Sequence, residues 1–174
     1  MDNVTLKHTN LNVSRICFGA MTFGGQTDEP AAARMLDRCA DAGINFLDTA
    51  NVYNAGASEE MLGRLLAGQR DRFIIASKVR NKMGDGPDMN GLSRAAIHRA
   101  IDDSLRRLRM DYLDMYYLHL PDYAAPIEES LDEPRELVLA AFGPGLRERL
   151  DQAWVVTAEI REDVPDPGLG QGFE

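Results

Sequence analysis

Four polar side chains lie where the surrounding sequence is apolar: Asp48, Tyr53, Lys78 and His119. Three of them end short apolar segments, and Tyr53 follows the first of these segments closely. A buried lysine needs a partner for its charge, and a carboxylate on a neighbouring segment would provide one. A phenol, an ammonium, a carboxylate and an imidazole brought together in this way could deliver a proton to a substrate.

Proton delivery to a carbonyl oxygen is the chemistry that suits these groups best. A tyrosine with an unperturbed pKa near ~10 is a poor acid at neutral pH, but a nearby ammonium stabilises the phenolate. Asp48 would keep Lys78 charged and oriented, and a neutral His119 would donate a hydrogen bond to the substrate carbonyl. General-acid help of this kind contributes about 10²–10⁴-fold. The hydride that reduces the carbonyl carbon must then come from a cofactor.

Each residue alone has a simpler interpretation. A strand-end aspartate is often a turn or cap residue, a lone histidine is often a satisfied core group, and a tyrosine in a loop often only packs. Lys78 could neutralise a carboxylate, or it could be the Schiff-base nucleophile of an aldolase barrel. The joint pattern favours the reductase chemistry over these alternatives.

The segments that carry these residues alternate between strand and helix patterns. Short apolar strands are predicted over residues 15–19, 45–50, 73–79 and 113–120, and helices over residues 30–42, 59–67 and 94–108. Ser58 and Ser93 are the predicted N-caps of the second and third helices. Such alternation indicates βαβ units and a parallel sheet covered by helices.

Strand periodicity places the polar residues on one face. Side chains alternate along a strand, so Asp48, Lys78 and His119 should each end an inner face that also carries apolar residues. These apolar residues are Phe46, Ile74, Ala76, Met115 and Tyr117. Tyr53 would lie at the same end, which is where parallel α/β barrels build their active sites.

The glycine pattern argues against an open dinucleotide-binding sheet. GAMTFGG after the first predicted strand is not GxGxxG, and the chain has no GxxxxGK[ST].

The run D-T-A-x-x-Y-x-x-G-x-S-E-x-x-L-G, from Asp48 to Gly63, resembles a signature of the aldo-keto reductases. The segments VSRICFGAMTFGG, IIASKV and DYLDMYYLHLPD are similar to other parts of that family. The resemblance implies a (β/α)₈ barrel, a catalytic tetrad of Asp48, Tyr53, Lys78 and His119, and an aldehyde or ketone substrate. It also implies NADPH as cofactor, with Met21, Thr22 and Asp48 lining the nicotinamide.

The resemblance extends from residue 1 to about residue 132. The predicted fold is therefore a partial TIM barrel of about four β/α units, followed by a divergent tail over 133–174. Residues 1–122 hold 16 acidic and 15 basic side chains, whereas residues 123–174 hold 12 and 4. Short helices over 136–142 and 146–153, one strand over 154–160 and a disordered end are expected there.

A truncation, deletion or shifted reading frame would explain this break. Three functions remain open: an NADPH-dependent carbonyl reductase, a catalytically silent fragment, and a non-enzymatic interaction module. An open half barrel would also expose strand edges, so self-association is expected.

Charge, apolar content and cysteine spacing limit the partners and the location that can be expected. The net charge of −9 argues against nucleic-acid and anionic-membrane partners. The N-terminus lacks a signal-peptide pattern and no apolar run would span a bilayer, so a cytoplasmic protein is expected. Cys17 and Cys39 form no metal-ligand set, and we expect both to be reduced and buried.

Overall fold

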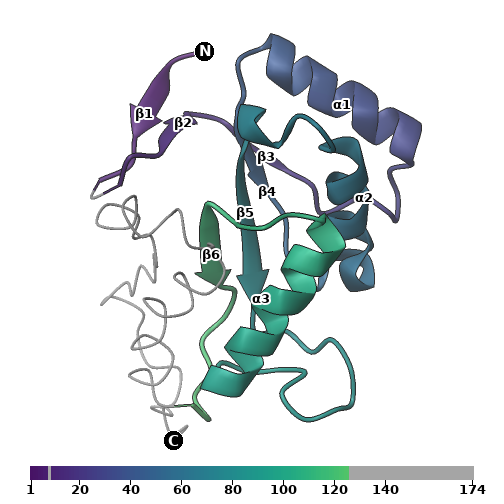
Figure 1. Ribbon diagram of the computed structural model, residues 1–174, viewed down its shortest axis with the longest axis vertical. Helices are drawn as coiled ribbons and strands as arrows, with labels where there is room; N and C mark the ends of the chain where they lie inside the picture. Colours follow the sequence, from purple (N-terminus) through teal and green to yellow (C-terminus); the bar gives the residue numbers. More distant parts are fainter. Residues whose placement is uncertain (8, 126–174) are drawn as a thin grey trace, which may run out of the picture.

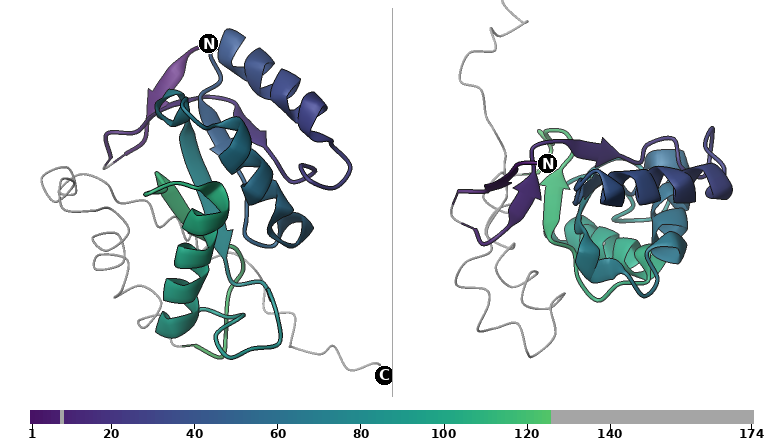
Figure 2. Two further views of the ribbon diagram at one scale, coloured as in Figure 1. Left: turned by 45° about the vertical axis from the view of Figure 1, so that its right-hand side comes forward. Right: turned by 90° about the horizontal axis from the view of Figure 1, so that it is seen from above.

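A four-stranded parallel sheet forms the centre of the computed structural model, which describes residues 1–7 and 9–125 (Figure 1). The strands lie in chain order: β3 (Cys17–Gly19), β4 (Phe46–Asp48), β5 (Ile74–Val79) and β6 (Met115–Leu118). The connections contain helices α1 (Glu29–Asp41), α2 (Ala57–Leu65) and α3 (Arg94–Leu108), with short 3₁₀ turns η1 (Tyr53–Gly56) and η2 (Arg70–Arg72). The three helices cover one face of the sheet (Figure 2).

This order confirms the predicted α/β architecture of four parallel strands joined by helices. Each strand is one to four residues shorter than predicted. Each helix agrees with its prediction to within two residues.

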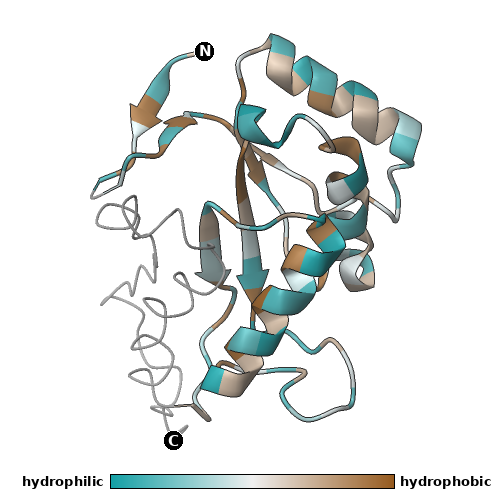
Figure 3. Cartoon of the chain, viewed as in Figure 1, coloured by the Kyte–Doolittle hydropathy of each residue, from teal (hydrophilic) through white to brown (hydrophobic). Residues whose placement is uncertain are grey.

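The register of the sheet separates a helix-facing surface from an inner surface. Leu47 pairs with Ile75, and both are fully buried beneath the helices. Figure 3 shows that β5 changes from apolar at its beginning to hydrophilic near its end, where the polar groups gather. The core between sheet and helices also includes Phe23, Leu36, Leu62, Leu66, Val79, Ile97 and Leu108.

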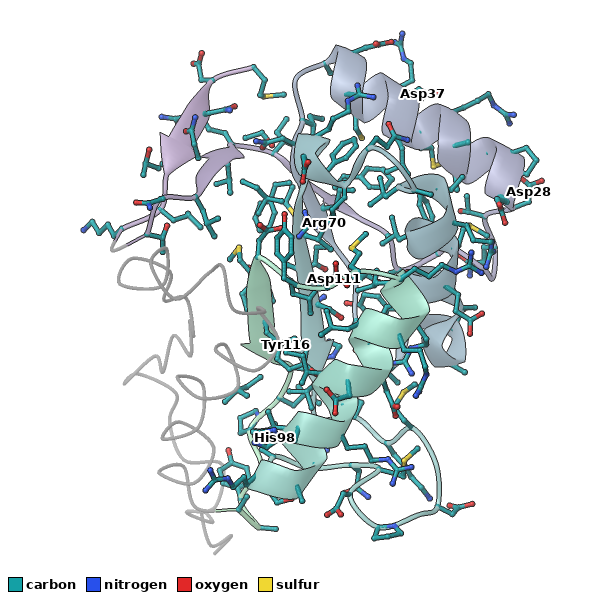
Figure 4. The ribbon with its side chains drawn as sticks, viewed as in Figure 1. Asp28, Asp37, Arg70, His98, Asp111 and Tyr116 are labelled. Atoms are coloured by element: carbon teal, nitrogen blue, oxygen red, sulfur yellow. The ribbon has the colours of Figure 1, made fainter. Side chains whose placement is uncertain are left out.

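Side-chain caps fix two of the three helix starts. Asp28, which is labelled in Figure 4, is the N-cap at the start of α1. Its side chain accepts a hydrogen bond from the Ala31 amide at 2.8 Å. Ser93 accepts from the Ala96 amide at 3.2 Å, which confirms it as the N-cap of α3. The prediction for Ser58 is wrong: it lies inside α2, and its buried hydroxyl bonds instead to Thr49 and to the Ala20 carbonyl.

A buried ionic network ties α2 and α3 to the sheet. Glu59 in the first turn of α2 has no solvent exposure. Its carboxylate accepts hydrogen bonds from Ser77 Oγ of β5 at 2.5 Å and from Arg107 Nε of α3 at 2.7 Å. Since a buried carboxylate is costly without such partners, the network fixes how these three elements pack.

Two features near the N-terminus differ from the sequence predictions. Strands β1 (Asn3–Thr5) and β2 (Asn12–Ser14) form an antiparallel hairpin that was not predicted. Asn45, just before β4, binds this hairpin: its Oδ1 accepts from the Ser14 amide at 2.7 Å. Cys39 is buried as expected, but Cys17 is exposed because it lies on the inner surface, where no helix covers it.

The inner surface of the sheet is only partly exposed. Ala76 and Met115 are buried, whereas Phe46, Ile74 and Tyr117 are partly exposed. Ala76 has strand neighbours on both sides, and Tyr117 Oη approaches Met115 Sδ at 3.8 Å.

Within residues 1–7 and 9–125, no helix is long and apolar enough to cross a membrane. The predictions for residues 133–174 lie outside the described residues, as does the boundary at 132.

Arg107→Met should destabilise the fold strongly, because it leaves the Glu59 carboxylate buried without its ion partner. We expect a loss of about 3 kcal/mol or more in the free energy of unfolding. Arg106→Met is the matched control, since that side chain is 71% exposed; its effect should stay below about 1 kcal/mol. Urea unfolding followed by circular dichroism measures both, and equal losses would contradict the proposed importance of the network.

Candidate active site

The ammonium group of Lys78 is the centre of the polar cluster at the carboxyl end of the sheet. Its Nζ donates to Asp48 Oδ1 at 2.5 Å, to the Thr49 carbonyl at 2.8 Å and to Tyr53 Oη at 3.0 Å. An ammonium has three hydrogens, so each has an acceptor. The Lys78 and Asp48 side chains are only 13% and 24% exposed.

Backbone hydrogen bonds beyond the strands keep these residues in place. The Thr49 amide donates to the Ala76 carbonyl at 2.9 Å, and the Asn51 amide donates to the Lys78 carbonyl at 3.3 Å. On the other side, the His119 amide donates to the Val79 carbonyl at 2.9 Å. The parallel ladder thus continues past the strand ends and fixes the spacing of the polar side chains.

The position of Tyr53 depends on a tight turn after β4. Asn54 and Ala55 both have a φ near +50°, a strained conformation for residues other than glycine. The Asn54 side chain stabilises the turn by donating to the carbonyls of Met21 and Phe23 at 2.9 and 2.8 Å. These bonds join the loop after β4 to the loop after β3.

His119 completes the cluster. Its ring meets that of Tyr53 edge to face, with centroids 5.8 Å apart, and its Nδ1 lies 3.1 Å from Asn81 Nδ2. Burial lowers the pKa of His119, the Lys78 charge lowers it further, and Asp48 opposes the shift. The two larger effects thus favour the neutral imidazole.

Two other tyrosines near the site are weaker acids than free tyrosine. Burial, followed by the charge of Asp48, raises the pKa of Tyr117 to about 12. Tyr116, a residue of β6 (Figure 4), is also buried, and this burial raises its pKa. Tyr53 is the tyrosine within hydrogen-bond distance of Lys78.

The loop after β3 forms the wall beside Asp48. Met21 is 60% exposed, whereas the Thr22 hydroxyl is bonded to that of Thr27 at 2.8 Å. Gly19 pairs with Asp48, and a side chain added to Gly19 would meet nothing within 4 Å. A flat group could lie against this strand end without a clash.

The structure thus brings Asp48, Tyr53, Lys78 and His119 together, with Met21 and Thr22 on the adjacent loop. Sequence reasoning missed Asn54 and Asn81, which orient the loops and the histidine. An asparagine in a loop is not part of a helix or strand pattern, so the sequence gives no sign of its role. The partners of both residues lie more than 30 positions away and are seen only in the folded structure. No group of three or more potential metal ligands occurs in the described part of the chain.

The family model for the aldo/keto reductase family matches residues 15–140. The chain belongs to this family. The match continues eight residues past the predicted limit of the resemblance at 132. Aldo-keto reductases are oxidoreductases that generally use NAD(P)H and act on small carbonyl compounds. The polar cluster of this chain lies at the carboxyl ends of its parallel strands, the end at which TIM barrels build their active sites.

Several known aldo-keto reductases and related proteins are similar to this chain. The uncharacterized oxidoreductase YrpG of Bacillus subtilis is 42% identical over 140 residues, covering 74% of this chain and 43% of YrpG. The aryl-alcohol dehydrogenase [NADP(+)] of Phanerodontia chrysosporium is 35% identical over 166 residues, covering 84% of this chain and 43% of that enzyme. The chain thus spans less than half the length of these relatives.

A solved aldo-keto reductase structure is also similar. AKR11C1 from Bacillus halodurans, in its holo form, superposes with a TM-score of 0.71 at 41% identity, covering 79% of this chain and 46% of that one. The fold of this chain is therefore part of a TIM barrel.

The hydrogen bonding of Lys78 disfavours the aldolase alternative. A Schiff-base lysine attacks with a free amine lone pair, whereas Lys78 donates to three acceptors and is paired with Asp48. The arrangement suits a lysine that stabilises negative charge on Tyr53.

His119 should make stability depend on pH below neutrality. Its folded pKa is lower than the ordinary value of 6.5, so the unfolded chain binds a proton that the folded chain does not. Stability should therefore fall as the pH drops from about 7 through 6.5 to the folded pKa. The His119→Gln variant should lose less stability over this range. Urea titrations between pH 5 and 8 measure the difference, and parallel pH profiles would contradict the assignment.

Proposed function

We propose that this site reduces an aldehyde or ketone to an alcohol, with a hydride from NADPH and a proton from Tyr53. The observation that carries the proposal is the contact of one ammonium, that of Lys78, with both Asp48 and Tyr53. A phenol that donates its proton becomes an anion, and the adjacent ammonium stabilises that anion at the moment it forms.

The proton follows a short path in this proposal. As hydride reaches the carbonyl carbon, the Tyr53 hydroxyl transfers its proton to the carbonyl oxygen. Lys78 stabilises the phenolate that remains, and Asp48 holds Lys78 charged. A neutral His119 donates a hydrogen bond to the same carbonyl oxygen and orients it toward Tyr53.

The strand end beside Asp48 fits a nicotinamide ring. Gly19 leaves the surface of β3 open next to its strand partner Asp48, and Met21, two residues later, is 60% exposed. When bound there, NADPH would supply the hydride. Met21 would lie along the ring, the Thr22–Thr27 bond would hold the loop in shape, and Asp48 would border the ring on the β4 side.

The competing interpretation is a chain that binds no cofactor and acts as a silent fragment or an interaction module. The alignment with YrpG covers 43% of that relative, so similarity alone does not carry the relative's whole activity over to this chain. Titration with NADPH, followed by cofactor fluorescence, separates the two. A dissociation constant below about 1 mM supports the reductase, and no binding at that concentration supports the alternative.

Tyr53→Phe should abolish NADPH-dependent carbonyl reduction while leaving NADPH binding nearly unchanged, because only the donated proton is lost. The fall in turnover should be at least about 10²-fold. Tyr123→Phe is the matched control, since Tyr123 is 96% exposed and has no part in the proposed proton transfer. Turnover of the Tyr123→Phe variant should be unchanged. Steady-state rates with a small aldehyde panel measure this. Turnover retained in Tyr53→Phe would mean that another group is the acid.

We further propose that the 174-residue chain self-associates through the open side of the sheet. Among the described residues, β3 and β6 each have a strand neighbour on one side only. Unpaired edge strands favour pairing with another chain, and Ile16 and Leu120, next to these edges, are 52% and 49% exposed.

Light scattering coupled to chromatography tests this association. A mass of at least twice 19.3 kDa is expected, increasing with protein concentration. A sharp monomer with a cooperative thermal transition would contradict it.

A further inference from the structure

The loop after β5 places the side-chain amide of Asn81 against the Nδ1 atom of His119. Asn81 Nδ2 lies 3.1 Å from His119 Nδ1, although the two residues are 38 positions apart. Among the described residues, this is the one hydrogen bond formed by the imidazole of His119. This contact can therefore determine which of the two ring nitrogens carries hydrogen.

The backbone leading to Asn81 is strained. Arg80 has a φ of 125°, which side chains other than glycine rarely adopt. The Arg80 carbonyl accepts from the Gly91 amide at 2.9 Å, and the preceding Val79 carbonyl accepts from the His119 amide. Strain of this kind persists where surrounding contacts hold it, and here it directs Asn81 toward His119.

The chemistry of an amide nitrogen selects one form of the imidazole. An Asn NH₂ group only donates, and a neutral imidazole has one nitrogen that accepts and one that carries hydrogen. If Asn81 donates to Nδ1, the hydrogen must lie on Nε2. A doubly protonated ring would instead bring an N–H of His119 against an N–H of Asn81.

We propose that Asn81 is a positioning residue that holds His119 as the neutral tautomer with hydrogen on Nε2. The other groups facing His119 are Lys78 on β5, Asp48 on β4 and Tyr53 in η1. None of these forms a hydrogen bond with the ring in the described part of the chain, so they influence its charge but do not choose between its two neutral forms.

This inference rests on the proposed function for its purpose. A substrate carbonyl needs a hydrogen-bond donor from His119, and a neutral ring has only one N–H. With Nδ1 bound to Asn81, the Nε2–H is free to bind the carbonyl. Without Asn81 the ring would divide between two tautomers, one of which presents an acceptor to the substrate.

Long-range ¹H–¹⁵N correlation spectra of the whole chain test the tautomer directly. The chain has three histidines, and His119→Gln assigns the signals of interest. At pH 8, wild-type His119 should show a protonated Nε2 and an unprotonated Nδ1. Asn81→Leu should bring the two nitrogen shifts toward each other, because the ring then exchanges between tautomers.

Asn81→Asp is a second variant, in which the side chain keeps nearly the shape of asparagine but loses its hydrogen-bond donor. A carboxylate only accepts, so it should move the hydrogen to Nδ1 and raise the pH at which His119 titrates. Asn90→Asp is the matched control: it adds the same charge in the same loop at an exposed residue, and the tautomer should be unchanged. A wild-type ring protonated on Nδ1, or an Asn81→Asp ring still protonated on Nε2, would overturn the proposal.

These spectra need neither cofactor nor substrate. Failure of NADPH-dependent reduction would reject the proposed function and leave the tautomer result intact. An unchanged tautomer in an active enzyme would reject the role of Asn81 alone.

Discussion

A charged ammonium in a partly buried position is the constraint on which this site depends. Lys78 is 13% exposed, and burying an unpaired charge of this kind costs several kcal/mol. The cost is offset only if each N–H finds an acceptor at once. All three acceptors, Asp48 Oδ1, the Thr49 carbonyl and Tyr53 Oη, come from β4 and the segment that follows it. The charge of Lys78 thus fixes the register of β5 against β4 and, through Tyr53, the path of the next turn.

Neighbouring residues of β5 serve two separate networks. Lys78 points to the inner surface and Ser77, one position earlier, points to the helices, since side chains alternate along a strand. Ser77 binds Glu59, which in turn is paired with Arg107. A displacement of β5 would therefore disturb an ion pair on each of its faces. Helices α2 and α3 thus support the polar cluster through Ser77 on the opposite face of β5, which agrees with the general need for supporting contacts behind a functional site.

Strand periodicity was enough to predict that Asp48, Lys78 and His119 would converge, because it depends only on spacing within each strand. Strand periodicity could not predict contacts that depend on a turn or on a distant helix. Glu59 is one of two adjacent glutamates at the start of the second predicted helix, and the partner of its buried carboxylate, Arg107, lies 48 residues away. The β1–β2 hairpin was missed because Asn3–Thr5 and Asn12–Ser14 are too short for a clear alternating pattern.

The contacts that shape the polar cluster come from the carboxyl ends of neighbouring parallel strands and from the loops that follow them. Lys78 binds groups of β4 and the segment after it, His119 binds Asn81 of the loop after β5, and the turn beside Tyr53 is tied to the loop after β3. The groups proposed to deliver the proton therefore depend on the register of three neighbouring strands. Gly19 pairs with Asp48 in that same register, so the surface that Gly19 leaves open beside the cluster depends on it as well.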